Sequence, residues 1–204
     1  MTRCIDLLRH GEPEGGRRYR GHGVDHPLSA TGWRQMWDAV GDHCPWDRIL
    51  SSPLQRCRAF AEALAARHGL PLVVDERLRE VGFGTWEGRT PAELQAEDPE
   101  GYAAFYADPV HRRPPGAEPL KAFIARVTAA FDAALQDPAG GHLLWVVHAG
   151  VIRAVVARVL QAPPIALYRM RTDYAGLSRV CVRPQGVMLQ FHNRPRLAPE
   201  PGPA

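Results

Sequence analysis

The chain has 204 residues, a formal net charge of +3, 45% hydrophobic residues and 23% charged residues. This length suits one domain with a substantial core, and the composition is typical of a soluble globular protein. So small a positive charge does not favour a nucleic-acid partner. The N-terminal apolar run is short and contains Asp6, and no run is long enough to span a bilayer. We therefore expect no signal peptide and no membrane partner.

The four cysteines are scattered along the chain, at Cys4, Cys44, Cys57 and Cys181. None of them forms a Cys-x-x-Cys pair, so the spacing predicts neither a zinc knuckle nor a disulfide framework. Cys4 and Cys57 lie in apolar patterns typical of small core residues. These features favour a reduced, cytoplasmic setting.

In the first half of the chain, strand and helix signals alternate. Short apolar runs predict strands at residues 4–8, 48–51 and 72–75. Ser29 is the expected N-cap of one helix. The segment 52–55 predicts the start of a second helix, with Ser52 as N-cap, and Gly69 marks its end.

In the second half, residues 90–118 predict an insertion of short helices and loops near the site, opened by a capping box at Thr90. Apolar residues at helical spacing predict a helix from Leu120 to Phe131. Further elements follow at residues 142–147 (a central strand), from Gly150 (a helix), and at 179–183 and 187–191 (a hairpin).

This alternation predicts an α/β fold with a largely parallel sheet. We expect a single domain over residues 1–194. The proline-rich residues 195–204 predict a disordered tail.

Chemistry-bearing residues follow the predicted strands. Arg9-His10-Gly11 ends the first strand, and three further segments carry similar residues, at 51–56, 78–88 and 146–150. Because parallel strands end at one edge of a sheet, we expect these segments to converge there.

In this order and at these separations, the four segments resemble the histidine phosphatase superfamily, which includes cofactor-dependent phosphoglycerate mutases and many small phosphatases. The resemblance covers about residues 4–193. It implies a three-layer α/β/α sandwich of the phosphoglycerate mutase type. The opening stretch, residues 6–16 with Arg20-Gly21 and Pro27-Leu28-Ser29, looks most like the alpha-ribazole phosphatase branch, which removes a phosphate late in cobalamin synthesis.

His10 is the candidate nucleophile. Nearby Arg9 and Arg56 disfavour its protonation, and a backbone carbonyl is expected to accept from its other ring nitrogen. Attack on phosphorus would give a phosphohistidine, which water would hydrolyse. The alternative is a strand-end histidine without a catalytic role.

Arg9 and Arg56 are the candidate phosphate clamp, because guanidinium groups match phosphate oxygens. Arg56 lies in the first turn of its predicted helix, where backbone amides also favour an anion. The resemblance implies that His148 hydrogen-bonds the phosphate as well. The alternative for His148 is a strand-terminal histidine bonded to backbone.

Glu80 is the candidate general acid and base, because an alkoxide leaving group needs a proton. Glu76 and Glu87 are the competing carboxylates. Glu80 is preferred because it matches the family motif position before Gly82 and Gly84, and Glu87 is expected to shape the loop.

The loop Arg17–Arg20 follows the first motif, and Arg20 and Gly21 are candidate substrate-binding residues at the pocket mouth. An exposed arginine-rich loop is the alternative. Gly16 replaces the asparagine common in mutases, and residues 116–119 lack the serine of the family's Gly-Glu-Ser element. The chain also lacks the extra length of typical mutases, so hydrolysis is favoured.

We expect no metal and no cofactor, since the remaining histidines lack ligand spacing and neither a Walker nor a dinucleotide loop is present. The predicted partner is a small phosphorylated substrate, and the oligomeric state stays open. The leading function is hydrolysis of alpha-ribazole 5'-phosphate. The alternatives are a phosphoglycerate mutase or broad-specificity phosphatase, and an inactive phosphate-binding scaffold.

Overall fold

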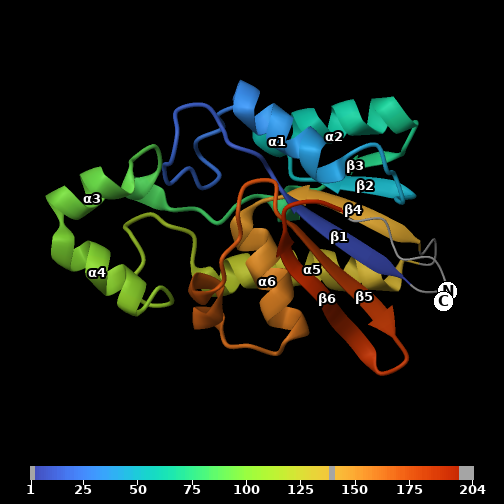
Figure 1. Cartoon of the computed structure of the whole chain (residues 1–204). Helices are drawn as coiled ribbons and strands as arrows, with labels where there is room; N and C mark the ends of the chain where they lie inside the picture. The colour runs from blue at the N-terminus through green and yellow to red at the C-terminus, as the bar shows by residue number, and fades with distance from the viewer. Residues whose placement is uncertain (1–2, 138–140, 198–204) are drawn as a thin grey trace.

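A computed structural model of the chain describes residues 3–137 and 141–197. Its centre is a six-stranded sheet with strand order β3-β2-β4-β1-β5-β6 (Figure 1). The strands are β1 Cys4–Arg9, β2 Arg48–Ser51, β3 Leu72–Val74, β4 His142–Val147, β5 Leu177–Arg183 and β6 Gly186–Arg194. The four strands β1, β2, β3 and β4 run parallel to one another. Strands β5 and β6 form an antiparallel hairpin, and β5 pairs with β1 in antiparallel orientation. The predicted α/β class, central strand and hairpin are confirmed.

Helices cover both faces of the sheet, with α1 and α2 on one face and α5 and α6 on the other (Figure 1). The helices are α1 Ala30–Val40, α2 Gln55–His68, α3 Pro91–Glu97, α4 Pro99–Ala107, α5 Leu120–Gln136 and α6 Ala149–Val159. Short 3-10 turns are η1 Glu76–Leu78, η2 Gly84–Trp86 and η3 Pro164–Arg169. Helices α3 and α4, which lie within the predicted insertion, project away from the sheet.

The core has two parts because successive strand residues face opposite sides of the sheet. On β1, Ile5 and Leu7 pack with α5 and α6, whereas Leu8 packs with α1 and α2. On β4, Trp145 packs on the side of α5 and α6, and Leu144 packs on the side of α1 and α2. The sheet is thus buried between two helical layers, the expected three-layer sandwich.

Helix ends follow local capping rules at three of the four predicted points. Ser29 Oγ accepts from Gly32 N, Thr90 forms its capping box, and Gly69 ends α2 with a left-handed φ of 66°. The prediction that Ser52 caps α2 is wrong. The helix begins at Gln55, and Leu54 is its N-cap without a side-chain hydrogen bond.

A disulfide joins Cys4 of β1 to Cys181 of β5. These residues are directly paired across the two antiparallel strands, with Cα atoms 4.1 Å apart. The prediction of no disulfide is therefore wrong, because 177 residues separate the two cysteines and only strand pairing brings them together. Cys57 is fully buried, as expected for a core cysteine.

The end of the described chain returns to the body of the protein. Leu197 N donates to Ala39 O at 2.9 Å, and the Leu197 side chain packs against the α1 side of the core. The prediction of a disordered tail is thus wrong for residues 195–197, and residues 198–204 lie outside the described residues. Among the helices within residues 3–137 and 141–197, none has the length and apolar character to cross a membrane.

Candidate active site

Three adjacent strands, β2, β4 and β1, end at the same edge of the sheet. Arg9 pairs with Val147, and His10 N donates to Val147 O at 2.9 Å. On the other side of β4, Ser52 N donates to Val146 O at 3.1 Å. These bonds place the residues that follow each strand side by side.

His10 and His148 are neighbours at this edge. Their ring centroids lie 5.2 Å apart in an edge-to-face arrangement, and both side chains are buried. The convergence predicted from the strand-end motifs is therefore present for these two residues.

The backbone fixes the tautomer of His10. Its Nδ1 lies 2.7 Å from the carbonyl oxygen of Gly11, an acceptor only, so Nδ1 carries the proton and Nε2 carries the lone pair. Burial lowers the pKa of His10 well below its ordinary value, and the charges of Arg56 and Arg9 lower it further. The site therefore holds a neutral imidazole whose Nε2 can act as a nucleophile.

Arg9 and Arg56 are held by main-chain carbonyls. Arg9 Nη1 donates to Thr172 O at 2.6 Å, and its guanidinium lies 4.1 Å from the ring centroid of Tyr174. Arg56, 1% exposed, donates to Gly21 O at 2.7 Å and to Val24 O at 3.0 Å.

Both guanidinium groups keep unused donors. The Nε atoms of Arg9 and Arg56 are buried and have no hydrogen-bond partner within the described residues. Buried cations with unpaired donors are costly unless an anion completes the site. Their position next to a neutral nucleophile makes a tetrahedral oxyanion the natural ligand.

His148 precedes α6 and is fully buried. Its Nε2 lies 2.7 Å from Ser52 Oγ and 3.5 Å from Cys57 Sγ. Burial lowers the pKa of His148 well below its ordinary value, and Arg56 and His10 add to this. The neutral ring lies next to the amides of the first turn of α6, where an anion is favoured.

Ser52 is a site residue that the sequence analysis assigned to a helix cap. Its hydroxyl lies 2.7 Å from His148 Nε2 and also accepts from Leu54 N at 3.3 Å, and α2 starts later than predicted. Its place in the motif 51–56 was the available signal, but a serine before a proline also fits a helix start.

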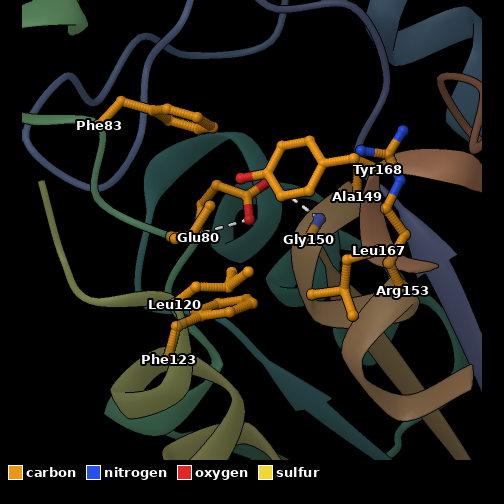
Figure 2. A pocket seen from close by; sticks show the side chains of 10 residues that line it. Glu80, Phe83, Leu120, Phe123, Ala149, Gly150, Arg153, Leu167 and Tyr168 are labelled. Atoms are coloured by element: carbon orange, nitrogen blue, oxygen red, sulfur yellow. Dashed lines mark hydrogen bonds between the residues drawn. The ribbon is translucent and has the colours of Figure 1, made fainter. Parts of the chain in front are cut away.

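Glu80 reaches the start of α6. Its Oε1 accepts from Val81 N at 2.9 Å, and its Oε2 accepts from Gly150 N at 3.2 Å (Figure 2). A Cβ at position 150 would collide with Oε1, so the glycine there makes space for this carboxylate. Glu80 is thus bonded to a residue that lies two positions after His148 in the chain.

The two competing carboxylates have other partners. Glu76 is exposed and forms an ion pair with Arg79 at 3.5 Å. Glu87 accepts from Phe83 N at 2.8 Å and from Gly23 N at 2.9 Å, so it shapes the loop as expected.

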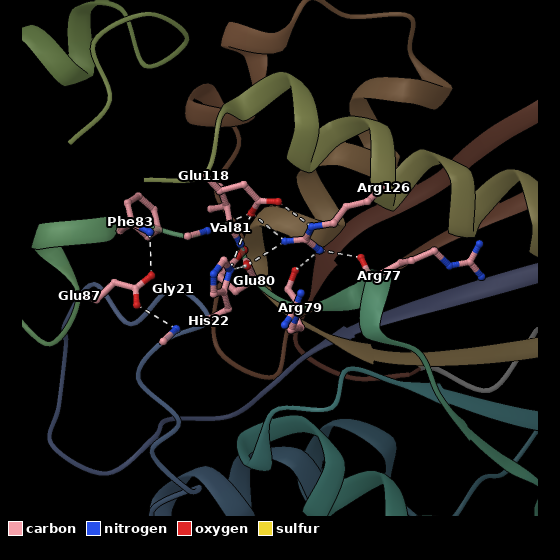
Figure 3. Close-up of polar contacts among 12 residues, drawn as sticks. Gly21, His22, Arg77, Arg79, Glu80, Val81, Phe83, Glu87, Glu118 and Arg126 are labelled. Atoms are coloured by element: carbon pink, nitrogen blue, oxygen red, sulfur yellow. Dashed lines mark hydrogen bonds and ion pairs between the residues drawn. The ribbon is translucent and has the colours of Figure 1, made fainter. Parts of the chain in front are cut away.

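Arg126 of α5 and Glu118 hold the segment that carries Glu80 (Figure 3). The two side chains form an ion pair at 2.8 Å, and Glu118 Oε2 accepts from Gly82 N at 3.1 Å. Arg126 also donates to three main-chain carbonyls, those of Arg77, Arg79 and Glu80, at 2.7, 2.8 and 3.1 Å. The backbone is therefore fixed on both sides of Glu80. No motif indicated this pair, because its partners are main-chain atoms.

The loop Arg17–Arg20 folds back on itself at Arg20. The Arg20 Nη2 donates to Glu14 O and Gly16 O, each at 2.6 Å, and its Nε donates to His26 Nδ1 at 3.3 Å. Gly21, at φ +53°, presents its carbonyl to Arg56. These bonds give Arg20 and Gly21 a structural part in the site, and their contact with substrate stays a prediction.

Across the residues that the structure describes, no group of three or more histidine, cysteine, aspartate or glutamate side chains is placed to hold a metal ion. The candidate site is built from imidazole, guanidinium and carboxylate groups on one sheet edge. That combination has the chemistry to bind an oxyanion next to a neutral imidazole and a carboxylate.

Residues 5–195 match the model of the histidine phosphatase superfamily (branch 1), and the chain belongs to this family. The adenosylcobalamin/alpha-ribazole phosphatase of Salmonella typhimurium is 33% identical over 171 residues, covering 82% of this chain and 84% of that protein. The solved alpha-ribazole phosphatase from Shigella flexneri superposes with a TM-score of 0.83 at 28% identity, covering 97% of this chain and 100% of that one.

A bifunctional protein of Mycobacterium tuberculosis is 37% identical over 182 residues, which cover 87% of this chain and 49% of that protein. The chain thus spans about half the length of this relative.

Proposed function

We propose that the protein is a phosphomonoester hydrolase that works through a phosphohistidine at His10, with alpha-ribazole 5'-phosphate as its substrate. One observation carries the reaction. A neutral, buried imidazole with its Nδ1 proton committed to Gly11 O lies beside two guanidinium groups that keep unpaired donors. The similarity to proteins named alpha-ribazole phosphatases supports the substrate.

In the first step Arg9 and Arg56 bind the phosphoryl oxygens, and His148 donates a hydrogen bond to one of them. Nε2 of His10 attacks phosphorus while the bond from phosphorus to the ester oxygen breaks. Glu80 gives its proton to the departing alkoxide, which leaves as the neutral alcohol. Glu80 ends this step as a carboxylate, and the phosphoryl group is bonded to His10.

In the second step water attacks the phosphohistidine. Glu80 takes one proton from the water, the bond from phosphorus to Nε2 breaks, and inorganic phosphate leaves. The enzyme returns to its starting protonation state. The arginines contribute by neutralising the equatorial oxygens in both steps, an effect of about 2.7–4 kcal/mol for a comparable oxyanion donor.

The proposal includes a place in cobalamin synthesis and a cytoplasmic location. Because the cytoplasm keeps most thiols reduced, the Cys4–Cys181 bond is the feature to check there. Thiol labelling of the protein in intact cells and after cell fractionation measures both its location and the state of this pair.

The test is hydrolysis by the purified protein in the presence of a chelator. Three substrates are compared: alpha-ribazole 5'-phosphate, 3-phosphoglycerate and a sugar phosphate. We expect the highest kcat/KM for the first, inhibition by vanadate, and a loss of at least roughly 1,000-fold in His10→Ala. Better turnover of 3-phosphoglycerate or the sugar phosphate would remove the substrate assignment. Equal activity of His10→Ala would remove the nucleophile.

A further inference from the structure

A cavity opens beside Glu80 (Figure 2). Its walls come from the loop after Glu80, from α5, from η3 and from the first turns of α6. Most of this lining is apolar, from Phe83, Leu120, Phe123, Leu167 and Tyr168. Arg113 Nη1 donates to the Tyr168 hydroxyl at 3.1 Å, which holds that ring in place.

Arg153 is the cationic residue in this otherwise apolar wall. It lies three residues after Gly150 on α6, so the two share a helix face. It is half-buried, and its Nε is sealed from solvent. Within the described residues, Arg153 has no hydrogen bond and no ion pair.

Other arginines near Arg153 do have partners. Arg158, one turn further along α6, pairs with Asp132 at 3.6 Å on the surface. Arg126 across the cavity wall is fully engaged with Glu118 and main-chain carbonyls. The Nε of Arg153 is sealed from water without an acceptor, which costs free energy, so its presence beside the candidate acid points to a ligand that supplies the missing acceptor.

We propose that this cavity binds the leaving alcohol of the substrate, and that Arg153 donates hydrogen bonds to an oxygen of that alcohol. The inference rests on the proposed phosphatase function and refines its substrate class. Glu80 must reach the ester oxygen, so the carbon next to that oxygen lies at the cavity mouth. The substrates are then phosphomonoesters whose alcohol has a hydroxyl a few bonds from the ester and an apolar group beyond it.

Arg153 is therefore a specificity residue distinct from the phosphate clamp. Arg9 and Arg56 bind the phosphoryl group, which every substrate shares. Arg153 binds a hydroxyl that only some alcohols carry. A charged donor to a substrate oxygen changes kcat/KM by roughly 10- to 100-fold.

The test compares substrates that differ only in the oxygens at issue. The first pair is alpha-ribazole 5'-phosphate and its 2',3'-dideoxy analogue. The second pair is glycerol 1-phosphate and propyl phosphate, which makes the test independent of alpha-ribazole as the substrate. Using Arg153→Met, we expect kcat/KM for the hydroxyl-bearing member of each pair to fall roughly 10- to 100-fold more than for its partner.

Arg158→Met is the matched control, because it removes a guanidinium from the same helix outside the cavity. It should leave the ratio within each pair at the wild-type value. Arg153→Lys should recover part of the loss, since it keeps a donor and the charge. Thermal unfolding of Arg153→Met should occur at the wild-type temperature or above it, because no described hydrogen bond or ion pair is lost and an unpaired buried donor is removed.

An equal fall for both members of each pair would mean that Arg153 serves the phosphoryl group and would overturn the inference. Unchanged kcat/KM for all four substrates would overturn it as well. A lower wild-type KM for glycerol 1-phosphate than for alpha-ribazole 5'-phosphate would contradict the apolar part of the cavity. In each case His10→Ala still decides the phosphatase function separately, because that substitution abolishes turnover of every substrate.

Discussion

Strand β1 carries two buried polar clusters whose charges are balanced in different ways. At Asp6, the carboxylate accepts from Trp46 Nε1 at 2.8 Å and from Arg179 Nε at 2.6 Å, and it lies 3.0 Å from His142 Nε2. Burial raises the pKa of Asp6, but the hydrogen bonds of His142 and Arg179 outweigh this, and the pKa lies below its ordinary value. This cluster neutralises itself.

The second cluster begins three residues further along the chain. It consists of Arg9, His10, Arg56 and His148, and it contains no acidic residue of its own. Its charged members have the same sign, its imidazoles are held neutral, and two Nε donors stay unpaired. In the first cluster, loss of one partner leaves the other charge buried alone, which destabilises the fold. In the second, Arg56 has an ion pair with Asp25 at 3.8 Å, but the Nε atoms of Arg9 and Arg56 have no partner within the described residues, which favours a ligand there.

The largest expected effect comes from removing one arginine of each cluster. Arg179→Met leaves Asp6 buried without its cation and should lower the free energy of unfolding by about 3–5 kcal/mol. Arg56→Met should lower kcat/KM roughly 100- to 1,000-fold, with a smaller loss of stability. Denaturant unfolding and steady-state kinetics on both variants measure this. A larger stability loss in Arg56→Met than in Arg179→Met would break the comparison.

The Arg126–Glu118 pair tests how far the functional cluster depends on its support. Arg126→Met frees the backbone around Glu80, so the proton donor loses its position. We expect kcat/KM to fall roughly 10- to 100-fold for alkyl phosphates and much less for aryl phosphates, whose leaving groups need less protonation. Glu80→Gln should show the same pattern.

Lys121→Ala, an exposed change on the same helix, is the control for Arg126→Met and should behave as the wild type. Equal losses on alkyl and aryl phosphates would show that Arg126 supports the whole site and not the acid alone.

Anion binding should stabilise the protein through the functional cluster. Inorganic phosphate at about 100 times its Kd should add about 2.7 kcal/mol to the free energy of unfolding. In Arg56→Met this gain should shrink, while Arg158→Met should keep it. Thermal unfolding with phosphate and with chloride at equal ionic strength measures the difference. A gain that survives in Arg56→Met would place the anion elsewhere.

A final effect separates the two clusters by pH. The pKa values of His10 and His148 are lowered in the folded state, so the unfolded chain binds protons that the folded chain does not. The free energy of unfolding should therefore fall as the pH falls below about 6.5, by up to about 1.4 kcal/mol per pH unit for each histidine. Asp6, whose folded pKa is also lowered, should add its loss only below about pH 3.9.

Denaturant titrations between pH 4 and pH 8 measure this dependence. His148→Asn should flatten the curve between about pH 4 and pH 6.5, because one of the two depressed imidazoles is gone. An unchanged slope would mean that the buried histidines do not govern the acid response.

The sequence analysis could place the strand-end residues because each has a local signal. His10 and His148 directly follow apolar runs, and parallel pairing of those runs makes them meet. Arg56 lies in the segment 51–56, which the sequence analysis placed at a helix start, and it is the second residue of α2. The fold class follows from the same alternation of signals.

The supporting contacts could not be predicted in this way. The Cys4–Cys181 bond depends on antiparallel pairing between strands at opposite ends of the chain. Arg126 bonds to main-chain carbonyls, which every residue has. No pattern of side chains in the sequence could therefore predict these contacts. Arg20 was expected at the pocket mouth, but most of its described bonds are to backbone atoms of its own loop.

The absence of a side chain at Gly150 has a consequence for how activity can be lost. Any replacement there adds at least a methyl group where Glu80 Oε1 lies, and the flexible carboxylate must give way while the backbone keeps its place. We therefore expect Gly150→Ala to keep the fold and the anion site while slowing the turnover of alkyl phosphates, because only the side chain of Glu80 has to move.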